Sequence, residues 1–413
     1  MNEAMPAASQ PRVLHVTSAL DPGGIETWLL RIVRHPDGTP LVGGILALSA
    51  REGLLAPQFR ECGIPIYCLP PANNPLRFIA DLAGILRSTG PWHGVHSHVH
   101  RRSALVHLAS LMARVPLRVT HSHNTKGQET ASRNPLRGML SGWATYCINA
   151  ISNLRLACSR DAATALFGKP SEEDPKVLCM PYGIDLESFL RSSEAPASRA
   201  SLGIPKGAIV VGHVGRFMPQ KNHEFLLRVA AEAIDANPRL HFLLIGDGPL
   251  RPAIQKLAIS LGVDGHISFT GNRLDVPSLM RHAMDCFFFP SHWEGLGIVA
   301  LEAQALGLRC LLSDAIPIEA NRLPEQNRVF ALGATPSEVA VDLLSLAASG
   351  NDRGQAGPEP GHFLYSLDGN VDVLHSAYGR VLEPSAFTAP PRSPAGRLAP
   401  AAPSLKKGTP PWS

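Results

Sequence analysis

Residues 284–314 read MDCFFFPSHWEGLGIVALEAQALGLRCLLSD, and this stretch decides the predicted fold. It begins with an apolar run, continues through a helix-forming run and ends in a second apolar run. Strand, helix and strand in this order, with continuously apolar strands, are typical of a parallel sheet covered on both faces. Glu294 then lies in the loop at the carboxyl end of the first strand, and Glu302 lies inside the helix. Three interpretations are open for these carboxylates: a catalytic pair, a ligand cradle, or two surface charges beside a buried helix.

The same alternation recurs through most of the 413 residues, which exceed what one hydrophobic core usually organises. One series of apolar runs and amphipathic segments ends before the polar stretch LRSSEAPASRASLGIPKG, and a second series follows it. We therefore predict an α/β protein with two doubly wound, Rossmann-like parallel-sheet domains facing a central cleft. The predicted segments are a tail (1–10), a first domain (11–190), a linker (191–205), a second domain (206–383) and a disordered Pro/Ala-rich tail (384–413).

Several bulk features favour a cytoplasmic globular protein. No apolar run reaches the roughly 18 to 20 residues that span a bilayer, and the first residues lack the basic segment and apolar core of a secretory signal. Seven cysteines are scattered without CxxC spacing, as expected of reduced core residues. Only 6% of the chain is aromatic, and its basic residues are not interleaved with aromatics, so nucleic acid is not an expected partner.

Positive charge is concentrated between Arg77 and Lys169. Twelve Lys or Arg face three acids in this stretch, although the net charge of the whole chain is only +4. Such an excess attracts phosphates, acidic sugars or an anionic membrane surface. A solvated face that keeps the protein soluble explains the charge equally well, so the charge alone leaves both interpretations open.

Two loops at the carboxyl ends of predicted strands carry groups suited to phosphates. Gly23 and Gly24, in DPGGIET, allow close backbone approach at a helix N-terminus, although a tight turn also uses paired glycines. Arg216 and Lys221, in HVGRFMPQKNH, lie where ligands bind in this architecture. The forked guanidinium and the point charge of the ammonium suit two oxygens of a diphosphate, with ordinary surface cations as the alternative.

Two further turns also follow predicted strands. Gly246 and Asp247, in LIGDGPL, and Gly271 and Asn272, in FTGNRLDVPSLM, suit the edge of a nucleotide. Turn chemistry alone selects the same residue types, so neither turn is specific evidence by itself.

The helix that carries Glu302 adds a site for phosphate oxygens at its start. Backbone N–H groups there lack partners within the helix and carry partial positive charge. Glu302 has apolar residues four positions away on each side, and a carboxylate buried in such surroundings needs a hydrogen bond, for instance from a ligand hydroxyl. The residues at this helix start are Leu296, Gly297, Ile298 and Val299.

Histidines cluster in the predicted first domain. His96, His98 and His100 alternate at a strand end, which raises a metal hypothesis. No acidic or thiol ligand lies nearby in the sequence, and the two arginines that follow would repel a cation, so we expect no metal site. His121, in VTHSHN, lies where a strand reaches the cleft, and it is the candidate for contact with a substrate.

Taken together and in this order, the motifs resemble the retaining GT-B glycosyltransferases of family four, in particular bacterial capsular and exopolysaccharide enzymes. The resemblance covers about residues 11–332, and LYSLDGNVDVLHSAYGRVL is similar to the closing helix of that family. Tyr182 is a departure, because such proteins often carry Asn at this position. The motifs are GGIE, HSHVH, RVTHSHN, MPYGIDLESF, GRFMPQKNHEFLL, LLIGDGPLR, GNRLDVPSLM and PSHWEGLGIVALEAQALGLRCLLSD.

The resemblance implies a role for each candidate residue. In the E-x7-E motif, Glu294 lies by the transferred sugar and Glu302 contacts the ribose of the nucleotide. Arg216 and Lys221 bind the diphosphate, and His121 lies by the donor sugar. The glycine-rich loop near the phosphates and the acceptor corresponds to Gly23 and Gly24.

The implied reaction is transfer of a sugar, with retention at the anomeric carbon, from a UDP- or GDP-linked donor to a growing, lipid-linked cell-surface polysaccharide. The nucleotide sugar is a substrate, so neither a cofactor nor a metal ion is expected. The first domain is then the acceptor side and the second binds the donor, with the protein in the cytoplasm or peripheral on the inner face of the plasma membrane. A nucleotide-sugar epimerase and a non-catalytic sugar-nucleotide-binding protein on the same scaffold are the alternatives.

Overall fold

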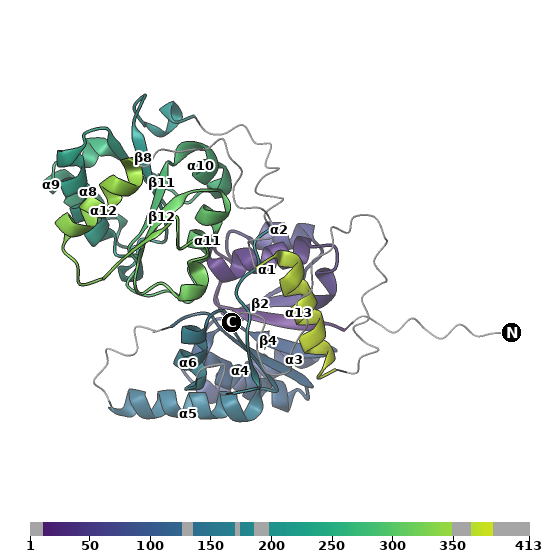
Figure 1. The fold of residues 1–413 in the computed structure, drawn as a ribbon. Helices are drawn as coiled ribbons and strands as arrows, with labels where there is room; N and C mark the ends of the chain where they lie inside the picture. Colours follow the sequence, from purple (N-terminus) through teal and green to yellow (C-terminus); the bar gives the residue numbers. More distant parts are fainter. Residues whose placement is uncertain (1–10, 126–134, 170–173, 186–197, 349–364, 383–413) are drawn as a thin grey trace, which may run out of the picture.

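The computed structural model describes residues 11–125, 135–169, 174–185, 198–348 and 365–382. Within these residues the chain forms two α/β domains, each with one parallel sheet and helices on both faces (Figure 1). This confirms the predicted pair of doubly wound, Rossmann-like domains. The predicted tails and the first part of the predicted linker lie outside the described residues: 1–10, 384–413 and 191–197.

Seven parallel strands form the sheet of the first domain. They are β1 (Val13–Thr17), β2 (Gly44–Ala47), β3 (Ile66–Cys68), β4 (Gly94–Ser97), β5 (Leu117–Ser122), β6 (Leu154–Ala157) and β7 (Val177–Cys179). Their order in the sheet is β3-β2-β1-β4-β5-β6-β7. The order therefore reverses between β1 and β4, which makes this edge the topological switch point of the domain.

Helices cover both faces of this sheet, which is why its central strands are buried and apolar. The helices of the chain up to residue 169 are α1 (Gly24–Arg34), α2 (Ala56–Glu61), α3 (Pro75–Thr89), α4 (Ser103–Met112), α5 (Pro135–Ile151) and α6 (Arg160–Phe167), with short 3₁₀ helices η1 (Thr39–Leu41) and η2 (His100–Arg102). α1, α2, α5 and α6 supply the core on one face, and α3 with part of α4 supplies the core on the other.

The second domain has the same architecture, with a sheet of six parallel strands. They are β8 (Ile209–Val214), β9 (Leu240–Ile245), β10 (Ile267–Gly271), β11 (Cys286–Phe289), β12 (Arg309–Ser313) and β13 (Arg328–Phe330). The order β10-β9-β8-β11-β12-β13 places the switch point between β8 and β11. The predicted strand–helix–strand unit of residues 284–314 is therefore observed, with β11 and β12 paired in parallel.

Two layers of helices also enclose the second sheet. They are α8 (His223–Ala236), α9 (Arg251–Ser260), α10 (Val276–Ala283), α11 (Ile298–Ala305) and α12 (Pro336–Ala348), with short 3₁₀ helices η5 (Ala200–Leu202), η6 (Pro219–Lys221), η7 (Asp264–His266) and η8 (Ile318–Ala320). α8, α9 and α12 pack on one face, and α10 and α11 pack on the other.

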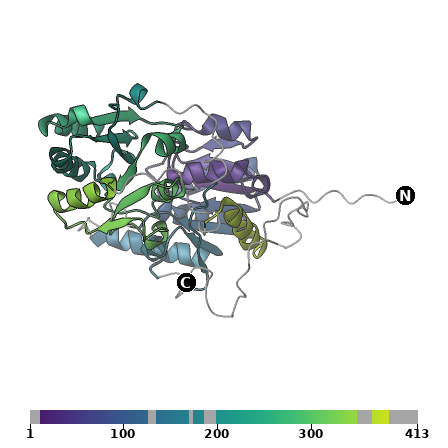
Figure 2. The ribbon, with the colours of Figure 1, turned by 45° about the horizontal axis from the view of Figure 1, so that its top comes forward.

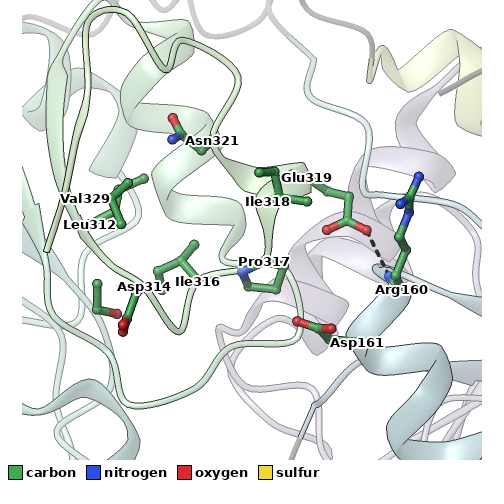
Figure 3. A pocket seen from close by; sticks show the side chains of 11 residues that line it. Arg160, Asp161, Leu312, Asp314, Ile316, Pro317, Ile318, Glu319, Asn321 and Val329 are labelled. Carbon is green, nitrogen blue, oxygen red and sulfur yellow. Dashed lines mark hydrogen bonds between the residues drawn. The ribbon is translucent and has the colours of Figure 1, made fainter. Parts of the chain in front are cut away.

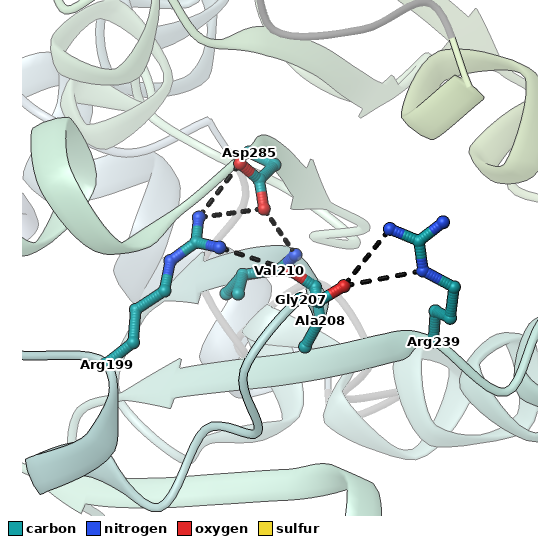
Figure 4. Close-up of polar contacts among 6 residues, drawn as sticks. All are labelled: Arg199, Gly207, Ala208, Val210, Arg239 and Asp285. Carbon is teal, nitrogen blue, oxygen red and sulfur yellow. Dashed lines mark hydrogen bonds and ion pairs between the residues drawn. The ribbon is translucent and has the colours of Figure 1, made fainter.

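Polar contacts fix the entry of the chain into the second domain (Figure 4). The Arg199 guanidinium donates to both carboxylate oxygens of Asp285, at 2.9 and 2.8 Å, and to the carbonyl of Ala208 at 3.1 Å. Asp285 in turn accepts a hydrogen bond from the backbone amide of Val210 at 2.7 Å. Arg199 falls within the predicted linker 191–205, but these contacts join it to the starts of β8 and β11.

The last described helix, α13 (Leu367–Gly379), packs against the first domain rather than the second (Figures 1 and 2). Trp28 Nε1 in α1 donates to Asn370 Oδ1 at 2.8 Å, and His96 Nδ1 shares a hydrogen bond of 2.6 Å with the Tyr378 hydroxyl. The sequence analysis assigned residues 206–383 to the second domain because they follow it in the chain. The buried contacts of α13 instead end the second domain before this helix.

Candidate active site

A cleft of about 1450 Å³ lies between the two domains. It is lined by loops and helix starts that follow β1, β8, β9, β10 and β11, as expected when two topological switch points border one space. All but two of the predicted site residues line it, and the exceptions are His121 and Gly271. Those that line it are Gly23, Gly24, Arg216, Lys221, Gly246, Asp247, Asn272, Glu294, Leu296, Gly297, Ile298, Val299 and Glu302.

Glu294 and Lys221 form an ion pair inside the second domain. Glu294 follows β11, and Lys221 ends η6 in the loop after β8. Lys221 Nζ lies 2.6 Å from Glu294 Oε1 and 4.7 Å from the centroid of the Phe289 ring. Glu294 is only 6% exposed, so loss of the lysine would leave a buried carboxylate without its cation. Arg216, from the same loop as Lys221, is exposed on the cleft.

Glu302 is paired with a cation from the other domain. Its Oε1 accepts a hydrogen bond of 2.6 Å from Arg31 Nη2, which joins α11 to α1. Glu302 is 6% exposed, and the hydrogen bond that a buried carboxylate needs comes here from a side chain of the first domain. The partner is not visible in the local sequence, because the two residues are 271 positions apart.

The start of α11 faces the cleft with its backbone amides. Gly297 precedes the helix in a left-handed conformation, with φ of 86°, and no side chain caps the helix. Ile298 and Val299 open the helix and both line the cleft. Their N–H groups lack acceptors within the helix, so this edge of the cleft favours an anion.

The turn after β9 is shaped by close backbone contacts. Gly246 has φ of 134°, and a Cβ on it would lie 2.2 Å from the carbonyl oxygen of Gly215, so only glycine fits. Its amide donates to the carbonyl of Gly271 at 2.9 Å. Gly271 therefore supports this turn from behind the cleft, while Asp247 and Asn272 line the cleft itself.

The structure corrects the prediction for His121. This residue lies within β5, is fully buried, and packs 5.6 Å from the ring of Trp28 and 4.0 Å from the ring of His123. Burial lowers the pKa of His121 to about 3, so the ring is neutral. His123 lines the cleft instead, because β5 ends at Ser122 and the next residue lies beyond the edge of the sheet.

A chain of hydrogen-bonded histidines runs inward from the cleft. The carbonyl of Leu41 can only accept, so His15 Nε2 donates to it at 2.9 Å. His15 Nδ1 then accepts from His98 Nε2 at 3.0 Å, and His98 Nδ1 accepts from His123 Nε2 at 2.7 Å. The remaining nitrogen of His123 accepts from the hydroxyl of Tyr182. One set of neutral tautomers therefore satisfies the whole chain, and it gives Tyr182 a defined partner.

The metal hypothesis for His96, His98 and His100 does not match the observed arrangement, since His100 lies in η2 and belongs to neither set of histidines whose ring nitrogens come close together. In the described residues, two other sets of buried histidines bring ring nitrogens within 4.8 Å of one another: His15, His96 and His98, and His98, His121 and His123. The hydrogen bonds that join the neutral rings of His15, His98 and His123 already account for much of the close spacing between these ring nitrogens. We therefore propose no metal ion for the cluster.

Glu26, His123 and Arg31 are among the cleft residues that sequence reasoning missed. Glu26, in the first turn of α1, lines the cleft and is 9% exposed, and burial raises its pKa to about 7. Its position two residues after the paired glycines of GGIE was a signal that the sequence offered. His123 was separated from the selected histidine by one residue, and only the end point of β5 distinguishes them. Arg31 had no local signal.

Comparison with known proteins identifies the class to which this fold and cleft belong. Residues 194–331 match the model of the family Glycosyl transferases group 1. The chain is 34% identical over 312 residues to EpsF of Bacillus subtilis (strain 168), a protein whose name places it among the glycosyltransferases; the match covers 75% of this chain and 80% of EpsF. The chain therefore belongs to this glycosyltransferase family.

Other relatives and solved structures agree with this assignment. An Escherichia coli UDP-Gal:alpha-D-GlcNAc-diphosphoundecaprenol alpha-1,3-galactosyltransferase is 26% identical over 309 residues, covering 68% of this chain and 79% of that enzyme. Anabaena Alr3699/HepE, solved with UDP-glucose, superposes with a TM-score of 0.73 at 19% identity over 89% of this chain and 99% of the other. WaaG, a glycosyltransferase involved in lipopolysaccharide biosynthesis, gives a TM-score of 0.63 at 15% identity over 90% and 100% of the two chains. The chain is thus a GT-B glycosyltransferase similar to exopolysaccharide enzymes.

Proposed function

We propose that this glycosyltransferase moves a sugar, with retention at the anomeric carbon, from a UDP- or GDP-linked donor to a lipid-linked precursor of a cell-surface polysaccharide. One observation carries the proposal. The buried carboxylates of Glu294 and Glu302, the cations Arg216 and Lys221, and the start of α11 with its free amides all border the same interdomain cleft. The name of the Escherichia coli galactosyltransferase, which gives alpha-D-GlcNAc-diphosphoundecaprenol as its acceptor, supports the acceptor class.

The donor is held by groups that the second domain contributes. Arg216 and Lys221 balance the negative charge of the diphosphate, together with the amides at the start of α11. Glu294 accepts hydrogen bonds from hydroxyls of the transferred sugar, and Glu302 accepts them from the ribose. In this proposal the chain's own cations and helix amides stabilise the leaving diphosphate, without a resident metal ion.

The reaction forms one bond and breaks one bond. An acceptor hydroxyl oxygen bonds to the anomeric carbon on the face from which the diphosphate departs, and the carbon–phosphate oxygen bond breaks. The hydroxyl proton moves to the departing diphosphate. The cations lower the barrier because negative charge grows on the phosphate oxygens in the transition state.

Transfer is tested with the purified protein, UDP- and GDP-sugars, and a polyprenyl-diphosphate sugar acceptor, with products separated by mass. Glu294→Ala and Lys221→Ala should each remove transfer, whereas Gly265→Ala, whose added methyl meets open space, should not. Unchanged rates in both active-site variants would refute the assigned roles. An isomerised sugar formed without acceptor would instead identify an epimerase, and donor binding without turnover would identify a binding protein.

We also propose that the first domain contacts an anionic membrane surface through α5. Trp143 lies three or four residues from Met139, Leu140 and Tyr146 on this helix, and the four side chains are 47 to 72% exposed. α5 lies at the outer margin of the first domain (Figure 1), and the stretch that contains it holds the concentration of basic residues. Apolar side chains flanked by positive charge suit the interface of an anionic bilayer. No helix among the described residues is long and apolar enough to cross a membrane.

Vesicle sedimentation tests this surface. The protein should pellet with phosphatidylglycerol vesicles at low salt and stay in solution with phosphatidylcholine vesicles. Trp143→Ser should weaken the binding, whereas Leu274→Ser, which removes an exposed apolar side chain from the second domain, should not. Equal sedimentation of all three proteins would exclude α5 as the contact.

A further inference from the structure

The first domain contacts the loop after β11, which carries Glu294, very closely at Gly295. A Cβ placed on Gly295 would lie 1.7 Å from the carbonyl oxygen of His123, 2.5 Å from its carbonyl carbon and 3.1 Å from the amide nitrogen of Asn124. All three atoms belong to the first domain. Gly295 is not in the left-handed region, so its own backbone would accept alanine. The need for glycine at this position comes entirely from the other domain.

A buried hydrogen bond holds the same residue from a second direction. Ser159 Oγ donates to the carbonyl oxygen of Gly295 at 2.5 Å and accepts from the amide of Ala162 at 3.1 Å. Ser159 is fully buried and is the N-cap of α6. One hydroxyl therefore caps a helix of the first domain and binds the backbone beside Glu294.

A further contact lies next to this one, beside a smaller cavity of about 330 Å³ (Figure 3). The carboxylate of Glu319, in η8 of the second domain, accepts from the backbone amide of Arg160 at 2.9 Å. Arg160 is the first residue of α6, so the carboxylate also lies at the positive end of that helix. At the other end of the E-x7-E motif, Arg31 of the first domain binds Glu302.

We propose that Ser159, together with the close contact at Gly295, positions Glu294 when the two domains close on the donor. The inference rests on the proposed role of Glu294 at the donor sugar. Gly295 is the next residue in the chain, so any shift of its carbonyl relative to Ser159 moves the carboxylate as well. Lys221 holds the Glu294 side chain but belongs to the same domain, and it cannot set the distance between that carboxylate and the acceptor side.

Gly295→Ala separates this positioning from donor binding. The added methyl must move from 1.7 Å to beyond 3.0 Å from the His123 oxygen, so the domains cannot close fully. A displacement of this size should lower kcat by about 100-fold. Affinity for UDP and GDP, measured by calorimetry, should match that of Gly265→Ala, because the second domain supplies the groups that hold the nucleotide.

Ser159 is tested by two variants that differ in helix capping. Ser159→Ala removes both hydrogen bonds, so it should lower both kcat and the thermal stability. Ser159→Asp keeps a capping acceptor for α6 but sets a carboxylate against the Gly295 carbonyl, so it should lower kcat with a near-normal melting temperature. Normal kcat in Ser159→Asp would overturn the proposed role of this serine.

Small-angle scattering keeps the proposal independent of turnover. Gly295→Ala and Ser159→Asp should both have a larger radius of gyration than the parent protein and Gly265→Ala. If the parent protein neither binds UDP or GDP nor transfers sugar, the proposed function fails, and scattering still decides whether Gly295 docks. Parent-like kcat and parent-like scattering in Gly295→Ala would refute the inference. If Gly295→Ala does not fold, then the backbone at residue 295 cannot accept alanine even when the domains separate. That outcome would also contradict the inference.

Discussion

Replacing Glu26 by glutamine should stabilise the protein at neutral and alkaline pH. Glu26 lies in the first turn of α1, where the helix N-terminus favours a carboxylate. Burial opposes this and dominates, raising the pKa from 4.5 to about 7. Arg216 lowers the pKa and Asp21 raises it, but both effects are smaller than that of burial. The folded protein therefore holds a proton on Glu26 that the unfolded chain has lost.

The size of the effect follows from that pKa difference. Between pH 4.5 and 7 the folded state binds the proton and the unfolded state does not, so the free energy of unfolding falls as the pH rises. A pKa difference of about 2.5, at about 1.4 kcal/mol for each pKa unit, amounts to about 3 kcal/mol once the pH exceeds 7. Glutamine has the same shape and no charge to bury. Glu26→Gln should therefore be about 3 kcal/mol more stable than the parent at pH 8, and less than about 1 kcal/mol more stable at pH 5.

Chemical denaturation at pH 5, 6, 7 and 8 measures this difference. The parent and the variant are compared at each pH, so contributions from the buried histidines, whose pKa values are lowered by burial, cancel. Glu232→Gln, which changes an exposed glutamate of α8, is the matched control and should show a small difference at every pH. A stability gain for Glu26→Gln that stays constant from pH 5 to 8 would show that Glu26 does not carry the shifted proton.

Two further predictions concern buried contacts of the first domain. Asn370→Ala removes the acceptor shared by Trp28 Nε1 and the Gly183 amide. The free energy of unfolding, measured by chemical denaturation, should therefore fall by about 3 kcal/mol, and the amides of α13 should exchange hydrogen faster. Unchanged exchange in α13 would contradict this prediction. Tyr182→Phe keeps the ring that stacks on His123 but removes the hydroxyl that donates to it. The free energy of unfolding should fall by about 1 kcal/mol in the same assay. An unaltered denaturation midpoint would show that the hydroxyl does not bind His123.

The sequence was sufficient for the fold because local patterns specify it. Largely apolar strands such as LHFLLI of β9 and CFFF of β11 are buried on both faces, and a sheet between helices provides that environment. The same reasoning located Lys221 and Glu294 at the cleft, since each lies in the loop that follows a strand at a switch point. Residues placed by their own strand can be found from the sequence alone.

Residues placed by distant partners could not be found in this way. Arg31 and Glu302 are 271 positions apart, and α13 binds Trp28 across 342 positions. Neither contact leaves a periodic or turn signal near its members. His121 was selected in place of His123 for a different reason: sequence patterns locate the end of a strand only to within a few residues. A difference of one residue at the end of β5 decides which ring reaches the cleft.

Charge balance explains how a cleft with three buried carboxylates can accept an anionic donor. Glu294 is neutralised by Lys221 from its own domain, and Glu302 by Arg31 from the opposite domain. Within the described part of the chain Glu26 forms no such ion pair, and its pKa of about 7 means that a proton neutralises a large fraction of it near neutral pH. A diphosphate beside the Gly23–Gly24 turn would raise that pKa further, since a like charge disfavours ionisation. Binding of UDP at pH 7 should therefore take up protons, and the enthalpy measured in two buffers of different ionisation heat should differ in the parent protein but not in Glu26→Gln.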